Sequence, residues 1–436
     1  MRLGYNILFV LFFWLSAPYY FLKMWRRGNW RAGFGQRFAR YSPELKAALA
    51  KRPVLWLHAV SVGEVGVCCQ LIRALEPHLA AFQILVSTTT STGMAELQRL
   101  LPPHIRRIYY PADFAGAVRR AFKAIQPRAV ILVEAELWPN FLCEAIATRC
   151  PLFLVNARIS ERSLRNYRFF RFFFRPIFAS FSGVGCQQPE DARRMTELGF
   201  RAEAVHVTGN LKFDAAQPGP GAGLDVPALL RRIGVGEKAM LLVAGSTHAG
   251  EEVILAELLI RLRRRFPNLF LILAPRHAER AREVARELET RGIKFICRSD
   301  IPAGGPIAPG RLECLLVNST GELKYFYEQA TVVFVGKSLT ARGGQNPIEP
   351  AALGKPVIFG PYMQNFASAA QAFVDGRAAV QVQDAAGLEA ALAELLADER
   401  RRGELGARAR QVVQQNLGAT ERTVRLIVEG LPPAPT

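Results

Sequence analysis

Short apolar runs alternate with helix-length stretches along most of the chain. The runs that have the length of buried strands and end at turn residues are 54–59, 83–88, 105–110, 129–133, 152–155, 183–185, 240–244, 269–273, 295–296, 313–317, 332–335 and 357–359. Strands that are apolar throughout and separated by helices indicate βαβ units around a parallel sheet that is covered on both faces. The pattern therefore predicts an α/β fold.

A stretch rich in proline and glycine, residues 215–223, interrupts this alternation. Such a composition is unsuited to a helix or strand, so we interpret residues 215–236 as a linker. It separates two predicted Rossmann-like domains, 36–214 and 237–410. The C-terminal helical segment 411–436 is expected to be able to pack back on the first domain. In open sheets of this kind, ligands bind at the carboxyl ends of the strands.

The N-terminus predicts a membrane anchor in residues 1–35. Residues 7–22 are almost continuously apolar and rich in aromatic side chains, and a basic flank follows, from Lys23 to Arg40. The apolar run is shorter than a comfortable bilayer span and contains Pro18, so a single span and an interfacial helix are both open. A buried helix of a soluble protein is the third interpretation. Basic residues after the run favour a cytoplasmic location for the domains that follow.

Composition narrows the class of partner. The 436 residues carry a formal net charge of +19, which points to a polyanionic partner such as nucleic acid, an anionic membrane or a phosphorylated substrate. The segment 165–175 mixes arginines with aromatic residues and suits either a membrane interface or a core helix with a basic outer face. No nucleic-acid recognition module accompanies it. Seven cysteines without C-x-x-C spacing predict neither a disulfide framework nor a zinc site.

The most informative motif is GGQNPIEPAALGKPV at residues 343–357. Its glycines allow close approach of the backbone to a ligand, and the helix that we expect after them offers N–H groups to phosphate oxygens. Glu349, one turn into that helix, is placed to hold ribose hydroxyls. The alternative is an ordinary glycine loop before a helix whose dipole favours an acidic residue.

Acidic residues also follow two predicted strands of the first domain. Glu64 lies just after the first strand, where a general base is expected, although a first-turn helix glutamate is the plainer interpretation. Glu134 and Glu136 end another strand and would point to opposite faces, so we expect one of them to face the ligand. Lys212 is a candidate for stabilising a charged transition state. In the second domain, Arg276 suits a phosphate.

Taken in order, these motifs resemble the 3-deoxy-D-manno-octulosonic acid (Kdo) transferases over nearly the whole chain. The matching segments are LHAVSVGE (57–64), STTTSTG (87–93), EAELWPN (134–140), NARISERS (156–163), TGNLKFD (208–214), GSTH (245–248), APRH (274–277) and GGQNPIEPAA (343–352). The resemblance implies a two-domain GT-B glycosyltransferase that moves Kdo from CMP-Kdo to the lipid A precursor, lipid IVA, in lipopolysaccharide biosynthesis. It also implies that the protein lies on the cytoplasmic face of the bacterial inner membrane, where it is anchored through its N-terminus and contacts anionic lipids.

Roles for individual residues follow from the same resemblance. Glu64 would be the general base of an inverting reaction, and Glu134 and Lys212 would support the transition state. No metal or cofactor is implied, because CMP-Kdo is itself the donor substrate. The residues that align with CMP-binding segments are Pro275, Arg276, Thr320, Gly321, Glu322, Asn346, Pro347, Ile348 and Glu349.

The chain departs from the family pattern at three places. Gln345 stands where the family usually has histidine, Lys337 where it usually has glycine, and Asn318-Ser319-Thr320 where Asp-Thr-Met is common. Two rival functions stay open at this point. One is a different GT-B enzyme that uses another nucleotide sugar, and the other is a non-catalytic, membrane-associated protein that binds a nucleotide sugar.

Overall fold

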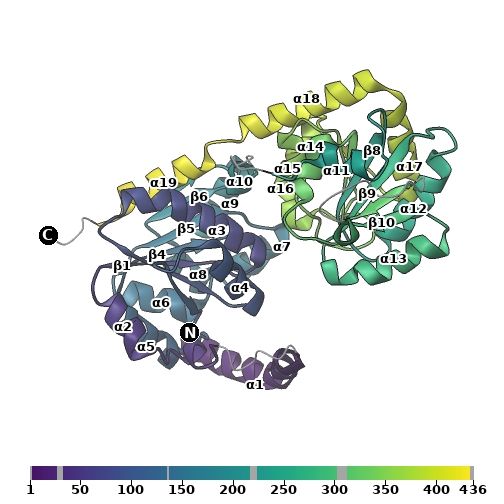
Figure 1. Ribbon diagram of the computed structural model, residues 1–436. Helices are drawn as coiled ribbons and strands as arrows, with labels where there is room; N and C mark the ends of the chain where they lie inside the picture. The colour runs from purple at the N-terminus through teal and green to yellow at the C-terminus, as the bar shows by residue number, and fades with distance from the viewer. Residues whose placement is uncertain (1, 27–32, 135–136, 217–222, 302–311, 433–436) are drawn as a thin grey trace. The chain divides into compact units, whose positions relative to one another are not determined.

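The computed structural model describes residues 2–26, 33–134, 137–216, 223–301 and 312–432 (Figure 1). It divides into two compact units, Met1–Ala215 with Leu417–Thr436, and Ala216–Asn416. Each unit is built on a parallel sheet of seven strands with helices on its faces. The predicted α/β class with two Rossmann-like sheets is confirmed.

The sheet of the first unit has the strand order β3-β2-β1-β4-β5-β6-β7. Its strands are β1 (Val54–His58), β2 (Gln83–Thr88), β3 (Arg106–Tyr109), β4 (Pro127–Val133), β5 (Leu152–Ala157), β6 (Gly183–Cys186) and β7 (Val205–Val207). Its helices are α1 (Arg2–Arg26), α2 (Pro43–Leu49), α3 (Val62–Leu75), α4 (Ser91–Leu100), α5 (Ala115–Ile125), α6 (Pro139–Ala147), α7 (Glu161–Phe169), α8 (Arg171–Phe178), α9 (Pro189–Leu198), α10 (Leu211–Ala215) and α19 (Ala419–Gly430), with 3-10 turns at Gly35–Phe38, Glu76–His78 and Ala202–Ala204.

Alternation along β1 explains why this sheet is buried on both faces. Val54 and Trp56 pack into one core with residues of α5, α6, α8 and α9. Leu55 and Leu57 pack into the opposite core with residues of α3, α4 and α19. All four side chains are buried, so the continuous apolar run is required by the two helical layers.

The second unit has the strand order β10-β11-β9-β8-β12-β13-β14. Its strands are β8 (Met240–Thr247), β9 (Leu269–Pro275), β10 (Phe295–Cys297), β11 (Cys314–Leu316), β12 (Val332–Val335), β13 (Val357–Phe359) and β14 (Val380–Gln381). Its helices are α11 (Val226–Arg232), α12 (Glu251–Leu262), α13 (Ala281–Thr290), α14 (Leu323–Gln329), α15 (Ile348–Ala352), α16 (Ala367–Asp375), α17 (Ala385–Ala397) and α18 (Glu399–Gln415), with 3-10 turns at Ala278–Arg280, Arg298–Asp300 and Gln364–Phe366.

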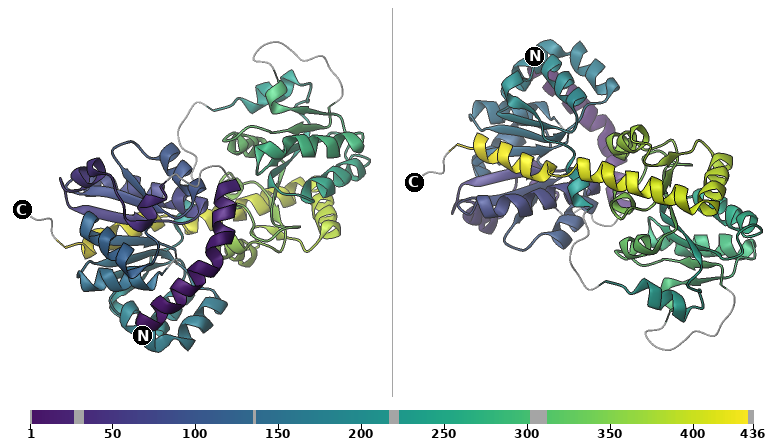
Figure 2. Two further views of the ribbon diagram at one scale, coloured as in Figure 1. Left: turned by 90° about the horizontal axis from the view of Figure 1, so that it is seen from below. Right: turned by 90° about the horizontal axis from the view of Figure 1, so that it is seen from above.

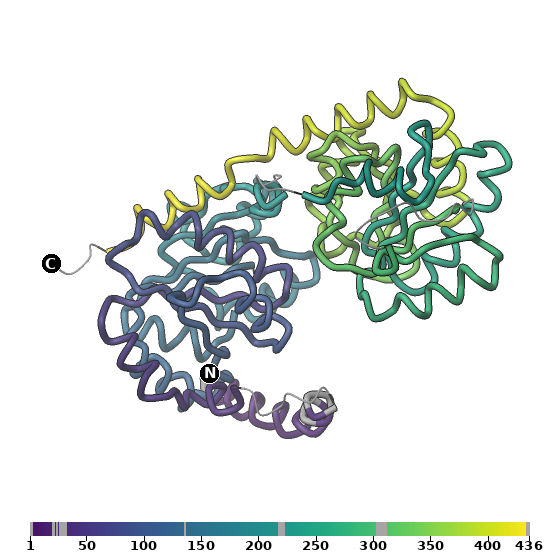
Figure 3. The backbone as a smooth tube through the Cα atoms, in the orientation of Figure 1, coloured from purple at the N-terminus to yellow at the C-terminus, as the bar shows by residue number. Residues whose placement is uncertain are grey.

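The chain returns to the first unit at its C-terminal end. It leaves the second unit through α18 and continues as α19 (Figure 3), which lies over the first unit's sheet in the right view of Figure 2. Asp214 holds the start of α19, since its carboxylate accepts hydrogen bonds from the backbone N–H of Gly418 at 2.9 Å and of Thr420 at 2.6 Å. Arg422 donates to the Thr208 carbonyl at 2.9 Å.

The boundaries around the predicted linker differ from the structure. Residues 217–222, the Pro-Gly core of that linker, lie outside the described residues. The remainder of 215–236 contains α11, which begins with Asp225 as its N-cap, since the Asp225 side chain accepts from the Ala228 N–H. The C-terminal segment joins the first unit at Leu417, later than the predicted boundary at residue 411.

The N-terminal helix α1 is attached to the first unit by one side. The Tyr5 hydroxyl donates to Asp113 at 2.8 Å, and Asn140 donates to the Asn6 side chain at 2.6 Å. Phe9 packs edge-on against Trp138. Other large apolar side chains of α1 are exposed, namely Leu3, Ile7, Leu8, Val10, Leu11, Phe12, Trp14, Leu15, Tyr19, Leu22 and Trp25. Among the described helices, none combines the length and the apolar character that a bilayer crossing requires.

The basic-aromatic segment 165–175 has both core-facing and exposed aromatic side chains. Tyr167 and Phe174 are partly buried and pack against the core of the first unit. Phe169, Phe170 and Phe172 are exposed, with 77%, 48% and 61% of their surface accessible. The segment therefore both covers the core and presents aromatic rings to its surroundings.

Candidate functional site

Glu64 lies at the start of α3, directly beyond the carboxyl end of β1. Ser61 is the N-cap of that helix, and its hydroxyl accepts from the Glu64 N–H at 3.3 Å and donates to Glu64 Oε1 at 2.8 Å. Glu64 Oε2 accepts from the Val60 N–H at 2.9 Å. The side chain is half-buried. The plainer interpretation of a helix-capping glutamate is therefore realised, and the same contacts fix the carboxylate at a strand's carboxyl end.

Glu134 follows the carboxyl end of β4, the strand beside β1, and forms a buried ion pair. Lys212 Nζ lies 2.8 Å from Glu134 Oε1, and Arg158 Nε lies 3.9 Å from Oε2. The backbone of Glu134 is left-handed, with φ of 61°. Because a residue with a Cβ adopts this conformation at a cost, the surrounding contacts must hold it there. The neighbouring Glu136 lies outside the described residues.

Asn156 connects the two members of this pair. It lies where the register of β5 against β6 shifts, with φ of 53°. Its Nδ2 donates to Glu134 Oε1 at 3.3 Å, while its Oδ1 accepts from the Leu211 N–H at 3.0 Å. Leu211 begins α10, the helix that carries Lys212. An irregularity in a strand can redirect a side chain toward a site. Here the Asn156 side chain joins the Glu134 carboxylate to α10, the helix that carries Lys212.

The three predicted catalytic residues thus lie at the carboxyl ends of strands of the first sheet. Glu64 and Glu134 follow the adjacent parallel strands β1 and β4. Lys212 follows β7 and reaches Glu134 directly. This edge, formed by the carboxyl ends of the strands, is where open α/β sheets bind their ligands.

In the second unit, the predicted donor residues also follow the carboxyl ends of strands. Pro275 ends β9 and Arg276 is exposed beside it. Thr320, Gly321 and Glu322 follow β11 and precede α14. The Glu322 carboxylate is bound by Arg298 at 3.0 Å and by the Ser319 hydroxyl.

The glycine motif opens a short helix, as the sequence predicts. Asn346 Oδ1 accepts from the Ile348 N–H at 3.0 Å, which starts α15 after Pro347, and Asn346 Nδ2 donates to Glu349 Oε1 at 3.0 Å. Burial raises the pKa of Glu349, whereas the Asn346 hydrogen bond and the charges of Arg276 and Lys324 act to lower it. The charge of Arg276 thus acts on Glu349, although the two residues are far apart in the sequence.

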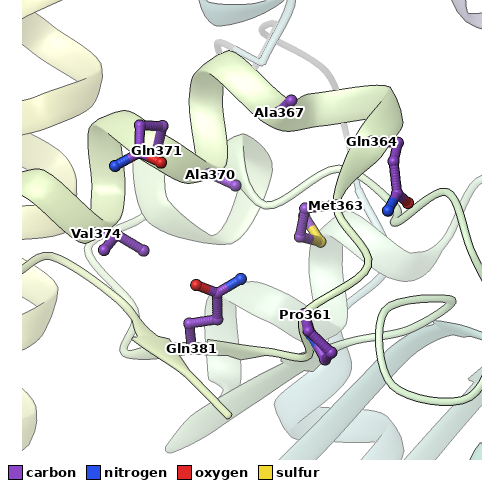
Figure 4. A pocket seen from close by; sticks show the side chains of 8 residues that line it. All are labelled: Pro361, Met363, Gln364, Ala367, Ala370, Gln371, Val374 and Gln381. Atoms are coloured by element: carbon purple, nitrogen blue, oxygen red, sulfur yellow. The ribbon is translucent and has the colours of Figure 1, made fainter. Parts of the chain in front are cut away.

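A pocket of the second unit borders this loop but contains none of the predicted residues (Figure 4). It lies between α16 and the segments after β13 and at β14, and it is lined by Pro361, Met363, Gln364, Ala367, Ala370, Gln371, Val374 and Gln381. Gln364 joins it to the glycine loop, because its Oε1 accepts from the Gly343 N–H at 2.8 Å.

Glu251 is a residue of this region whose contacts the sequence did not reveal. It is fully buried at the start of α12 and accepts four backbone hydrogen bonds. Oε2 accepts from the backbone N–H of His248 at 2.9 Å and of Lys337 at 2.7 Å. Oε1 accepts from the backbone N–H of Ser338 at 2.9 Å and of Leu339 at 3.0 Å. Its strand-end position after β8 was a signal, but its partners lie far along the chain.

Comparison with known proteins gives the family. Residues 32–215 match the family described as 3-Deoxy-D-manno-octulosonic-acid transferase (kdotransferase). A 3-deoxy-D-manno-octulosonic acid transferase of Bordetella pertussis is 36% identical over 434 residues, covering 95% of this chain and 97% of the relative. This chain belongs to the Kdo transferase family. A second relative of that name, from Haemophilus influenzae, is 31% identical over 401 residues and covers 90% of this chain and 91% of its own.

Further similarities agree with membership of the Kdo transferase family. Residues 311–412 match the family described as Glycosyl transferases group 1. A crystal structure of a glycosyltransferase from Rickettsia africae matches with a TM-score of 0.56 at 12% identity, covering 87% of this chain and 97% of its own. At that identity the likeness concerns the fold. The chain is thus a glycosyltransferase with a GT-B-like fold, in which each of two units contains a parallel sheet.

Proposed function

We propose that this Kdo transferase family member moves Kdo from CMP-Kdo to lipid IVA, with Glu64 as general base and inversion at the anomeric carbon. The observation that carries the proposal is the likeness to a relative named as a Kdo transferase over 95% of this chain. The position of Glu64, Glu134 and Lys212 at one sheet edge supports the assignment of their roles.

The proposed reaction is a single displacement. A hydroxyl oxygen of the acceptor forms the new bond to the anomeric carbon of Kdo while its proton passes to Glu64. The bond from that carbon to the phosphate oxygen breaks, and CMP leaves with the electron pair. Glu134 and Lys212, held at 2.8 Å, supply a preorganised charge pair near this exchange. The proposed mechanism requires no metal and no cofactor.

The donor is assigned to the second unit. Arg276 suits the phosphate of CMP, because a guanidinium can bind two phosphate oxygens at once. Glu349, fixed by Asn346, suits the ribose hydroxyls. The other proposed donor contacts are Pro275, Thr320, Gly321, Glu322, Pro347 and Ile348.

The proposed location of the protein is the cytoplasmic face of the bacterial inner membrane. The exposed apolar side of α1 would enter the lipid interface while Tyr5 and Asn6 keep the helix attached to the first unit. Flotation with vesicles that contain phosphatidylglycerol tests this proposal. A Trp14→Glu/Leu15→Glu variant should stay unbound, whereas Val207→Glu, which alters an exposed valine of β7, should float like the unaltered protein. Equal flotation of both variants would exclude α1 as the attachment.

Incubation with CMP-Kdo and tetraacylated lipid A precursor, followed by mass spectrometry, tests the proposed reaction. The expected product is the precursor with added Kdo. Glu64→Gln should abolish the product while CMP binding and the melting temperature persist, because the amide keeps one oxygen for the Val60 N–H. Glu44→Gln is the matched control, since Glu44 is another first-turn glutamate behind a serine cap. Absence of product from the unaltered protein, or full activity of Glu64→Gln, would contradict the proposal.

A further inference from the structure

Lys337 has an unusual backbone for a residue with a long side chain. It follows β12 and has φ of 53°, in the left-handed region that glycine adopts most readily. This conformation explains why glycine is usual at this position in the Kdo transferase family. Strained residues of this kind persist where the surrounding structure holds them, and they gather at functional sites.

Glu251 holds the backbone of Lys337 in place. The buried carboxylate accepts from the N–H groups of Lys337, Ser338 and Leu339, so three successive donors converge on it. The same carboxylate accepts from His248 at the end of β8. A charged acceptor with several backbone donors is a strong local restraint. The ends of β8 and β12 are therefore joined at the residue that carries the lysine.

The side chain of Lys337 runs over the glycine loop. A Cβ on Gly343 would lie 3.1 Å from Lys337 Cε and 3.4 Å from Cδ, so the lysine stem occupies the space that the missing side chain leaves. The Gly344 N–H donates to the Lys337 carbonyl at 2.8 Å. The lysine and this loop are thus bound together through both backbone and side chain.

Lys337 lies just beyond the carboxyl end of β12, and the proposed donor residues likewise end or follow strands of the same sheet. Burial lowers the pKa of His248, and the nearby charges of Lys337 and His277 contribute to the lowering. The rings of His248 and His277 are 5.8 Å apart, and His277 follows Arg276. Within the described residues, no carboxylate forms an ion pair with Lys337. An ammonium beside a glycine loop, with no carboxylate partner among the described residues, suits an anionic oxygen.

We propose that Lys337 binds a phosphate oxygen of the donor nucleotide at the 343–344 loop and that Glu251 is its positioning residue. The inference rests on the proposed function and adds a cation that the residues assigned above do not include. Its function is to bind the phosphate in the donor and to offset the charge that develops on it as CMP leaves.

Titration calorimetry of Lys337→Gly with CMP and with cytidine tests this inference. Glycine removes the charge and suits the left-handed backbone. We therefore expect CMP to bind about tenfold more weakly, the order of one charge-assisted hydrogen bond. Cytidine, which lacks the phosphate, should bind as it does to the unaltered protein. The melting temperature should be unchanged or higher, since the strain is relieved.

Arg342→Gln is the matched control, because it removes an exposed cation from the same loop. It should leave the affinity for CMP within about twofold, as expected for an exposed charge. Three results would overturn the inference: equal CMP affinity in Lys337→Gly and the unaltered protein, an equal loss with cytidine, or a loss seen only with CMP-Kdo. Failure of the unaltered protein to bind CMP would instead count against the proposed function.

Discussion

The buried pair Glu134–Lys212 gives a prediction whose size follows from the structure. Lys212→Met removes an ammonium 2.8 Å from a carboxylate, and the two side chains are 13% and 11% exposed. Removing one partner of a buried pair costs about 3–5 kcal/mol, because the remaining charge is left without compensation. Asn156 at 3.3 Å and Arg158 at 3.9 Å still face Glu134. We therefore expect a loss of about 3 kcal/mol in the free energy of unfolding, near the lower limit.

Tryptophan fluorescence during urea denaturation measures this loss in the first unit alone. All five tryptophans, Trp14, Trp25, Trp30, Trp56 and Trp138, belong to the first unit, so unfolding of the second unit does not contribute an intrinsic tryptophan signal. A separate signal matters because a protein of two units need not unfold in one step. The transfer assay is carried out on the same samples.

The double variant Glu134→Gln/Lys212→Met separates stability from chemistry. It removes both charges, so most of the lost stability should return, about 2 kcal/mol, whereas transfer should remain abolished. A single variant Lys212→Met that unfolds at the same urea concentration as the unaltered protein would refute the argument about the buried charge. Recovery of transfer in the double variant would refute the role of the pair in the reaction.

Three further predictions concern other hydrogen-bonded groups. Burial lowers the pKa of His58 to about 3, below its ordinary value, so the stability that the neutral ring provides above pH 6.5 is lost as the pH falls toward 3. Between about pH 6 and pH 4, the free energy of unfolding from urea denaturation should therefore fall more steeply in the unaltered protein than in His58→Gln, by about 1.4 kcal/mol per pH unit. Glu251→Gln should weaken CMP binding because an amide NH2 would face backbone donors, whereas Glu252→Gln, which alters an equally buried neighbour bound to Arg280, should destabilise the unit and leave the affinity unchanged. Asp214→Ala should destabilise the first unit by about 1 kcal/mol and speed hydrogen exchange in α19, and unchanged exchange there would contradict the capping role.

The sequence predicted the central strands and the edge strands β3 and β10, and it missed the edge strands β7 and β14. The apolar runs that became β1, β4, β8 and β9 are buried on both faces, which is the property that made them visible. The unpredicted strands are β7, with three partly exposed residues, and β14, with two. Each pairs with one neighbour at an edge. A strand that short is specified by its partner, so its own residues carry almost no periodic signal.

The sequence located the site residues better than their connections. Glu134 and Lys212 were identified separately, and their contact depends on the strand order that brings β4 and the segment after β7 to one edge. Glu251 begins α12, the helix that follows β8. Its bonds to the loop after β12 span 86–88 residues, so no local pattern could indicate them. The spacing of motifs along the chain indicates which reactive side chains follow strands. The strand order of the folded sheet determines which of these side chains lie close together.

Half of the described non-glycine residues with a left-handed backbone lie at the carboxyl ends of strands, where the ligands are proposed to bind. In the described part of the chain, eight residues other than glycine have positive φ. Four of them, Glu134, Asn156, Ser246 and Lys337, lie at or just beyond the carboxyl end of a strand, whereas Ala39, Gln126, Arg149 and Arg377 follow helices or turns. Ser246 and Asn156 also coincide with shifts of strand register. Such conformations cost of order 1–3 kcal/mol each, so neighbouring contacts must sustain them. At Glu134 the neighbours are Lys212 and Asn156, and at Lys337 the neighbour is Glu251. Both units therefore use buried hydrogen bonds and ion pairs to hold strained residues at the edge where their ligands are proposed to bind.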